Sequence, residues 1–199
     1  MQTIRTNKTN RSRPWGTTHP SNRRGIAIHH TVTPEGDSLE SVEAIIDRHI
    51  NGAHPYGSYN YVIDHAGRIW DIVGLDGVGA HAGGKNTPYL GVCYIGDGRY
   101  NFTEAARESF ADMVAYLEQQ CGKALEVVPH SALNATACPG DLIRNAIPTF
   151  REERARSGSL LTLEQGKQLA GWVGRGYHTR EYVLDVQQWG IWRGYLAAH

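Results

Sequence analysis

The sequence of 199 residues lacks a long apolar run, has few cysteines, and contains no acidic residue in its first 24 positions. The missing apolar run excludes a membrane-spanning helix and a secretory signal peptide, so we expect synthesis in the cytoplasm and no stable membrane insertion. Three cysteines, Cys93, Cys121 and Cys138, are an odd number spread widely along the chain. This pattern excludes a disulfide framework and predicts free thiols.

Charge of either sign is not in excess, because Lys plus Arg and Asp plus Glu each number 20. A net charge of zero creates no general attraction for nucleic acid, and no nucleic-acid partner is expected. The acid-free segment 1–24 nevertheless carries six basic residues, which are Arg5, Lys8, Arg11, Arg13, Arg23 and Arg24. We expect segment 1–24 to be a basic arm, either disordered or draped over the following domain.

The pattern of apolar residues predicts one α/β domain over residues 25–156, a sheet with helices packed on it. Strands are expected at 25–33, 59–63, 68–73, 90–95 and 125–128, the second and third forming a hairpin. Helices are expected at 37–52, 103–121 and 141–147. The long glycine-rich loop over 74–89 is of a kind that usually carries function.

Segment 157–199 differs in character from the domain before it. Ser157-Gly158-Ser159 is typical of a linker, Thr162-x-x-Gln165 of a capping box, and residues 179–198 of a helix. Three of the five tryptophans lie in this segment. We predict a small helical extension, which either docks on the domain or binds a ligand of its own.

Two histidines and a cysteine suggest a metal site. His29 is near the end of one predicted strand, His130 directly follows another, and Cys138 comes eight residues later (138 − 130 = 8). Two imidazoles and a thiolate suit Zn²⁺ and leave a fourth position for water or substrate. Taken singly, the same residues are also explained as a satisfied core histidine, a loop histidine and a small buried side chain.

Several segments resemble one family in their order and context. They are Ile28-His29-His30-Thr31, Ser58-Tyr59-Asn60-Tyr61-Val62-Ile63, Gly79-Ala80-His81, Leu90-Gly91-Val92, His130 and Thr136-Ala137-Cys138-Pro139-Gly140-Asp141. The chain is similar over about residues 25–147 to the zinc N-acetylmuramoyl-L-alanine amidases of bacteriophages and to peptidoglycan recognition proteins. The resemblance implies a mixed central β-sheet flanked by helices, with a groove above the metal.

The resemblance implies that His29, His130 and Cys138 are the zinc ligands. His30 should point to the opposite face of its strand, because side chains alternate there, although a register shift of one residue would exchange the two histidines. Tyr59 aligns with the catalytic tyrosine of the family, which donates to the developing oxyanion or orients water. Thr136 stands where some phage members have a lysine, so it can offer a hydrogen bond but no positive charge.

Residues of the glycine-rich loop are further candidates. His81 matches a family motif and is expected near the metal as a substrate or proton-transfer partner. Lys85, Asn86 and Tyr89 either line the groove as substrate-binding residues or belong to a solvated loop. His49, on the apolar face of the first predicted helix, is expected to pack in the core or to support the metal site.

The function implied is cleavage, by zinc-activated water, of the amide bond between N-acetylmuramic acid and L-alanine. The partner is then bacterial peptidoglycan. A phage endolysin acting on the wall after release is the expected role, and a bacterial autolysin or recycling enzyme is the alternative. Segments 1–24 and 157–199 are further candidates for wall binding. The alternatives are a recognition protein that binds muropeptide without cutting it and a zinc-stabilised nucleic-acid binder, which no known binding motif supports.

Overall fold

The computed structural model describes residues 3–4, 14–33, 42–45 and 58–152. These residues belong to one compact unit, Thr3–Arg154. The predicted extension 157–199 and His49 lie outside the described residues. Among the helices that are described, none has the length and hydropathy needed to span a bilayer.

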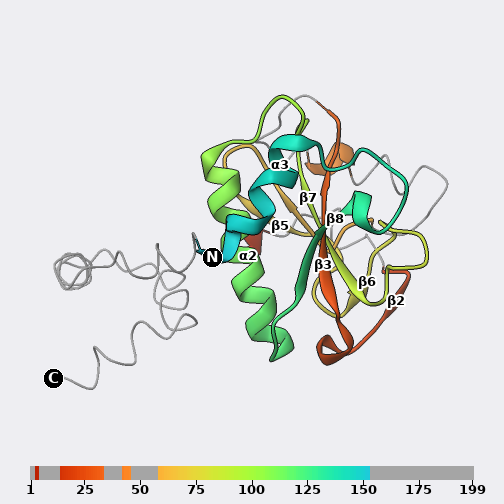
Figure 1. The fold of residues 1–199 in the computed structure, drawn as a ribbon. Helices are drawn as coiled ribbons and strands as arrows, with labels where there is room; N and C mark the ends of the chain where they lie inside the picture. The colour runs from red at the N-terminus through yellow and green to blue at the C-terminus, as the bar shows by residue number, and fades with distance from the viewer. Residues whose placement is uncertain (1–2, 5–13, 34–41, 46–57, 153–199) are drawn as a thin grey trace, which may run out of the picture. The chain divides into compact units, whose positions relative to one another are not determined.

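Six strands form a mixed central sheet in the order β1-β5-β4-β7-β3-β8 (Figure 1). They are β1 (Thr3–Ile4), β3 (Gly25–His30), β4 (Tyr61–Ile63), β5 (Ile69–Asp71), β7 (Tyr89–Tyr94) and β8 (Glu126–Pro129). The β4–β5 pair is antiparallel and the other pairs are parallel. The sheet confirms the predicted mixed α/β architecture and the predicted hairpin.

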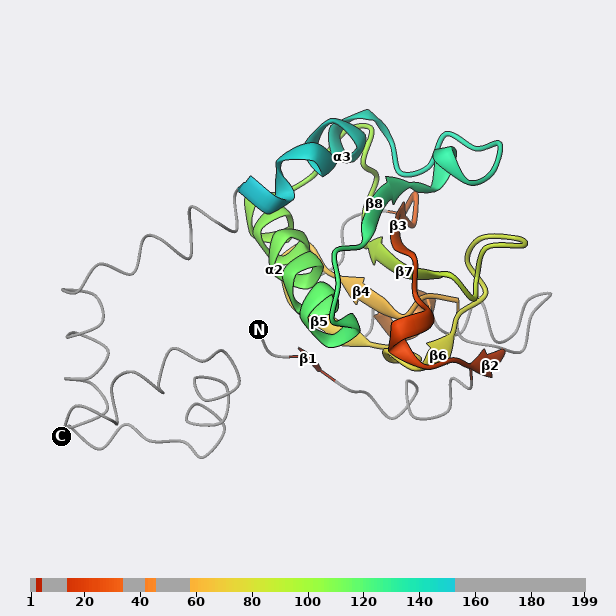
Figure 2. The same ribbon diagram turned by 60° about the horizontal axis from the view of Figure 1, so that its bottom comes forward.

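The central strands β3 and β7 are buried at every position. Helices lie on both faces of a sheet in this class, which is why such strands are continuously apolar instead of alternating. α2 (Glu104–Cys121) lies along one face (Figure 2). Residues 42–45, the described part of the first predicted helix, are helical, and Val42 packs with Val62 and Cys93.

The sequence signals for α2 act as predicted. The Thr103 hydroxyl caps the helix by accepting a hydrogen bond from the Ala106 N–H, and Gly122 ends it in the left-handed conformation with φ +67°. Phe110 of α2 stacks on Phe150, with ring centroids 5.7 Å apart. Phe150 follows α3 (Asp141–Ala146) and the turn η4 (Ile147–Thr149), so this contact ties the end of the described chain to α2.

Parts of the predicted basic arm belong to the fold. β1 pairs with β5, and β2 (Gly16–Thr17) pairs with β6 (Gly77–Val78) of the glycine-rich loop. η2 (Pro20–Asn22) follows, and the Arg23 side chain after it is fully buried. Strand pairing uses backbone groups, so a run of basic side chains does not prevent it. The domain boundaries 1–24, 25–156 and 157–199 remain predictions.

Two details refine the sequence predictions. β3 ends at His30 instead of Thr33, because Val32 leaves the extended conformation with φ +54° and donates its N–H to the Gly96 carbonyl. The three cysteines are free thiols, as predicted.

Candidate metal centre

Adjacent parallel strands bring the two candidate histidines together. β3 and β8 run side by side with Ile28 opposite Pro129, so the residues that follow, His29 and His130, meet at the same end of the sheet. Their ring centroids are 4.4 Å apart. Cys138 reaches the same point from the turn before α3, where its backbone carbonyl accepts a hydrogen bond from the Ser131 N–H.

One donor atom from each of His29, His130 and Cys138 lies within 4.8 Å of the other two. His29 Nδ1 is 3.8 Å from Cys138 Sγ. Donors around a tetrahedral Zn²⁺, with bonds of about 2.0–2.3 Å, are about 3.3–3.7 Å apart. The three residues therefore fit a metal ion of this size after a small contraction, and two imidazoles with a thiolate are a donor set that Zn²⁺ favours.

A second imidazole supports His29 from behind. His29 Nε2 lies 3.0 Å from His81 Nδ1, and His81 Nε2 lies 3.1 Å from the backbone carbonyl oxygen of Tyr89. Both side chains are buried. Burial lowers the pKa of His29 well below its ordinary value and that of His81 to about 4, so both rings are neutral at pH 7. A neutral imidazole is the form that binds metal ions.

His130 has its own support. Its Nε2 lies 3.2 Å from the side-chain oxygen of Asn134, and the Asn134 amide nitrogen donates to the Gly83 carbonyl at 3.3 Å. The Gly83 carbonyl can only accept, so the Asn134 oxygen must face His130. Sequence reasoning did not identify Asn134, although an amide four residues after a candidate ligand is a usable signal.

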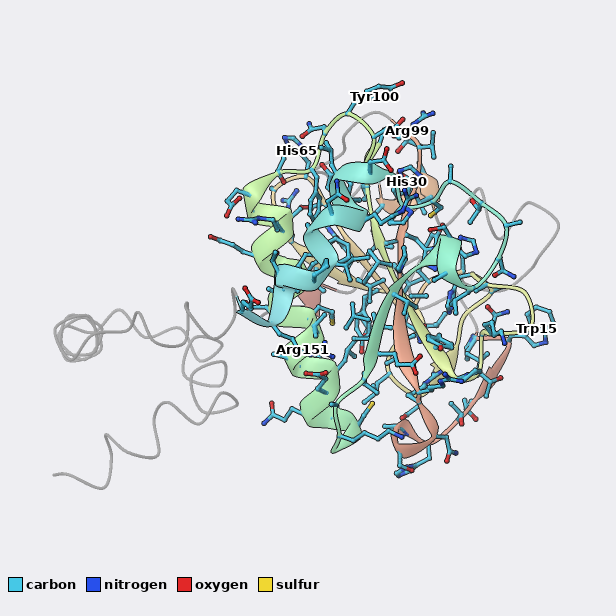
Figure 3. All side chains as sticks on the ribbon, viewed as in Figure 1. Trp15, His30, His65, Arg99, Tyr100 and Arg151 are labelled. Atoms are coloured by element: carbon cyan, nitrogen blue, oxygen red, sulfur yellow. The ribbon has the colours of Figure 1, made fainter. Side chains whose placement is uncertain are left out.

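Cys138 is half-buried, and burial raises the pKa of its thiol to about 11. Its sulfur accepts a hydrogen bond from the His30 N–H at 3.4 Å. Metal binding to this thiol therefore requires loss of its proton. The His30 ring lies on the other face of β3 beside the 97–99 turn, where its Nδ1 accepts from the Gly98 N–H at 3.0 Å (Figure 3). The strand thus presents His29, and not His30, to the other two donors.

Tyr59 lies beside His29, and Thr136 lies beside Cys138. The Tyr59 ring centroid is 5.2 Å from that of His29. Burial raises the pKa of Tyr59 well above its ordinary value, which keeps the phenol protonated and able to donate. The Thr136 hydroxyl oxygen accepts a hydrogen bond from the Cys138 N–H at 3.2 Å.

The structure does not bring Lys85, Asn86 or Tyr89 to the donor atoms. Lys85 is exposed in the loop. The Asn86 side-chain oxygen accepts from the backbone N–H groups of His81 and Ala82, at 2.9 and 2.7 Å, and so shapes the loop. Tyr89 is the first residue of β7, and its hydroxyl donates to Glu126, the first residue of β8, at the end of the sheet away from the three donors. A substrate-binding role for these three residues remains a prediction.

Comparison with known proteins agrees with this geometry. A family model described as N-acetylmuramoyl-L-alanine amidase matches residues 19–141. The chain is 30% identical to a peptidoglycan-recognition protein of Drosophila melanogaster in an alignment of 143 residues that covers 67% of this chain and 77% of that protein.

Solved structures show the same fold. Bumblebee PGRP-SA superposes with a TM-score of 0.67 at 20% identity, over 76% of this chain and 96% of that one. An endolysin of a Thermus scotoductus bacteriophage superposes with a TM-score of 0.58 at 23% identity, over 70% and 88% of the two chains. Because the family match covers more than half of its length and includes the three donor residues, the chain belongs to the N-acetylmuramoyl-L-alanine amidase family.

Proposed function

We propose that this protein is a zinc-dependent amidase that hydrolyses the bond between N-acetylmuramic acid and L-alanine in peptidoglycan. The observation that carries the proposal is the convergence of His29, His130 and Cys138, with one donor atom each within 4.8 Å of the others. Catalytic zinc sites use three protein ligands and keep one position open, whereas structural sites use four. Among the residues that the structure describes, three converge as metal donors, and this number favours a catalytic site over a structural one.

Zinc in such a site supplies Lewis acidity, polarising a carbonyl and acidifying water at neutral pH. His29 and His130 enter the site as neutral bases and Cys138 as a thiolate. The formal charge of a Zn²⁺ site with these ligands is +1, so hydrogen bonds from neighbouring side chains contribute a large share of the transition-state stabilisation.

Tyr59 and Thr136 are the neighbours suited to that task. The protonated Tyr59 phenol beside His29 donates to the oxygen of the scissile carbonyl as negative charge develops there. Thr136, held against the Cys138 backbone, offers a neutral hydroxyl to the same region. The negative charge that develops on the oxygen is therefore stabilised by hydroxyl dipoles of this chain. Position 136 holds a threonine and contributes no positive charge.

A recognition protein that binds muropeptide without cutting it is the second candidate, since peptidoglycan-recognition proteins of Drosophila melanogaster and Holotrichia diomphalia are among the relatives. Loss of a metal ligand would support that interpretation. Here all three donors and Tyr59 are present, which supports the enzyme. The role of a phage endolysin remains a prediction from the sequence.

The test is incubation of purified peptidoglycan with the zinc-loaded protein, with and without a chelator, followed by assay of new alanine amino groups and new reducing sugars. We expect alanine amino groups only, abolished by the chelator and by Cys138→Ser. Cys121→Ser is the matched control, because Cys121 is a buried thiol at the far end of α2. Reducing sugars would indicate a glycosidase, and binding without new alanine amino groups would indicate a recognition protein.

A further inference from the structure

Three groups in series determine where the proton of His29 lies. The chain runs from the Tyr89 carbonyl to His81 and from His81 to His29. A carbonyl oxygen only accepts, so His81 Nε2 carries a hydrogen and, in the neutral ring, His81 Nδ1 is an acceptor. His29 Nε2 must then donate, which leaves the lone pair of His29 on Nδ1. That atom is the one that faces Cys138 Sγ, 3.8 Å away.

The sequence makes room for the His81 ring. A Cβ at Gly91, in the middle of the buried strand β7, would lie 2.7 Å from two carbon atoms of the His81 imidazole. A glycine inside a strand weakens it and marks close approach of another group. At Gly91 the approaching group is His81. The space left by the missing side chain of Gly91 forms a socket that the His81 ring fills.

The backbone of the loop is fixed as well. The Asn86 side chain binds the N–H groups of His81 and Ala82, and Arg23 donates to the carbonyls of Asn86 and Thr87. These contacts hold the loop on both sides of the socket.

We propose that His81 is a positioning residue that holds His29 in the tautomer and orientation needed to bind the metal ion through Nδ1. This inference rests on the proposed metal centre, and it assigns His81 no direct contact with substrate. Partners of this kind orient a ligand imidazole, and their loss lowers metal affinity about 10–100-fold.

The first test measures zinc affinity by chelator competition in the full chain carrying His81→Phe, which keeps a ring in the socket but removes the acceptor. We expect affinity to fall about 10–100-fold. His65→Phe is the matched control, because His65 lies in the turn after β4 and its Nδ1 is 3.5 Å from the Tyr94 hydroxyl, away from the three donors. The zinc affinity of this variant should equal that of the wild type. Gly91→Ala, which displaces the His81 ring without removing any imidazole, should lower affinity in the same direction.

The second test reads the tautomer of His29 by imidazole ¹⁵N NMR in the metal-free protein. We expect a single Nε2–H form in the wild type and a mixture in His81→Phe. Unchanged zinc affinity in both His81→Phe and Gly91→Ala, or a wild-type His29 protonated on Nδ1, would overturn the proposal. Neither measurement uses substrate, so a protein that passes both tests but produces no new alanine amino groups from peptidoglycan would refute only the proposed hydrolysis.

Discussion

The guanidinium group of Arg23 donates a hydrogen bond to the backbone carbonyl of Gly77 in the interior of the protein. The same side chain, 0% exposed, also donates to the carbonyls of Leu75, Asn86 and Thr87. One cation thus joins the two ends of the loop that carries His81. The acceptors of these four hydrogen bonds are backbone carbonyl oxygens and not the carboxylate of an acidic side chain.

Arg23→Met should therefore lower the free energy of unfolding by about 2–4 kcal/mol, because several buried carbonyls lose their donor. Urea denaturation monitored by circular dichroism measures the change. Arg24→Met is the control, since Arg24 is exposed and pairs with an exposed Glu126, and it should have little effect. Equal changes in the free energy of unfolding for the two substitutions would show that the buried hydrogen bonds of Arg23 do not add to stability.

Tyr59→Phe removes a hydroxyl next to His29 and keeps the ring. If the phenol stabilises the oxyanion, kcat should fall about 10²–10³-fold with little change in KM or in zinc affinity. Steady-state kinetics on a soluble muropeptide, together with chelator competition, separates these quantities. A raised KM at unchanged kcat would instead assign Tyr59 to substrate binding.

Acid should destabilise the metal-free protein over a defined range. The pKa of His81 is about 4 in the folded protein and 6.5 ordinarily, so between these values the unfolded chain binds a proton that the folded protein does not. The stabilisation is complete above pH 6.5 and is lost as pH falls toward 4. His81 alone should lower the free energy of unfolding by about 2 kcal/mol from pH 7 to pH 5.

Burial also lowers the pKa values of His29 and His130. These two residues should therefore make the free energy of unfolding of the metal-free protein depend more steeply on pH. Urea titrations at several pH values in the presence of a chelator measure the slope. His81→Phe should make it shallower. An identical slope in wild type and variant would contradict the assignment of His81 as a buried neutral base.

Deletion of residues 157–199 should leave zinc affinity unchanged, because His29, His130 and Cys138 all lie in the unit Thr3–Arg154. Co-sedimentation with purified cell walls then tests the extension. Unchanged stability with weaker sedimentation would identify a wall-binding module. Reduced stability would instead indicate that the extension docks on the domain.

Much of the fold was predictable because its signals are local. Helix α2 has its cap, its apolar stripe and its terminal glycine within 20 residues, and β3 and β7 are short apolar runs. β1, β2 and β6 were not predicted, because strands of two residues carry no periodicity. Arg23 was assigned to a charged arm, since its burial depends on carbonyls more than 50 residues away.

The site was predictable only in part for the same reason. Matching of motifs indicated His29, His130, Cys138 and Tyr59, and the geometry brings them together. The direction of the hydrogen bonds from Tyr89 through His81 depends on three-dimensional contacts between loop and strand that no single-sequence pattern encodes. Gly91 was the one local signal: a glycine in a buried strand requires an explanation.

The three donors come from positions 29, 130 and 138, so the last lies 109 positions after the first (138 − 29 = 109). A ribosome making this protein must release residue 138 before the site can assemble, and His130 also needs β8 paired beside β3. The metal centre therefore cannot form until Cys138 has been synthesised and β8 has paired with β3. A product truncated before Cys138 would lack one of the three metal donors, whatever else of the fold it retained.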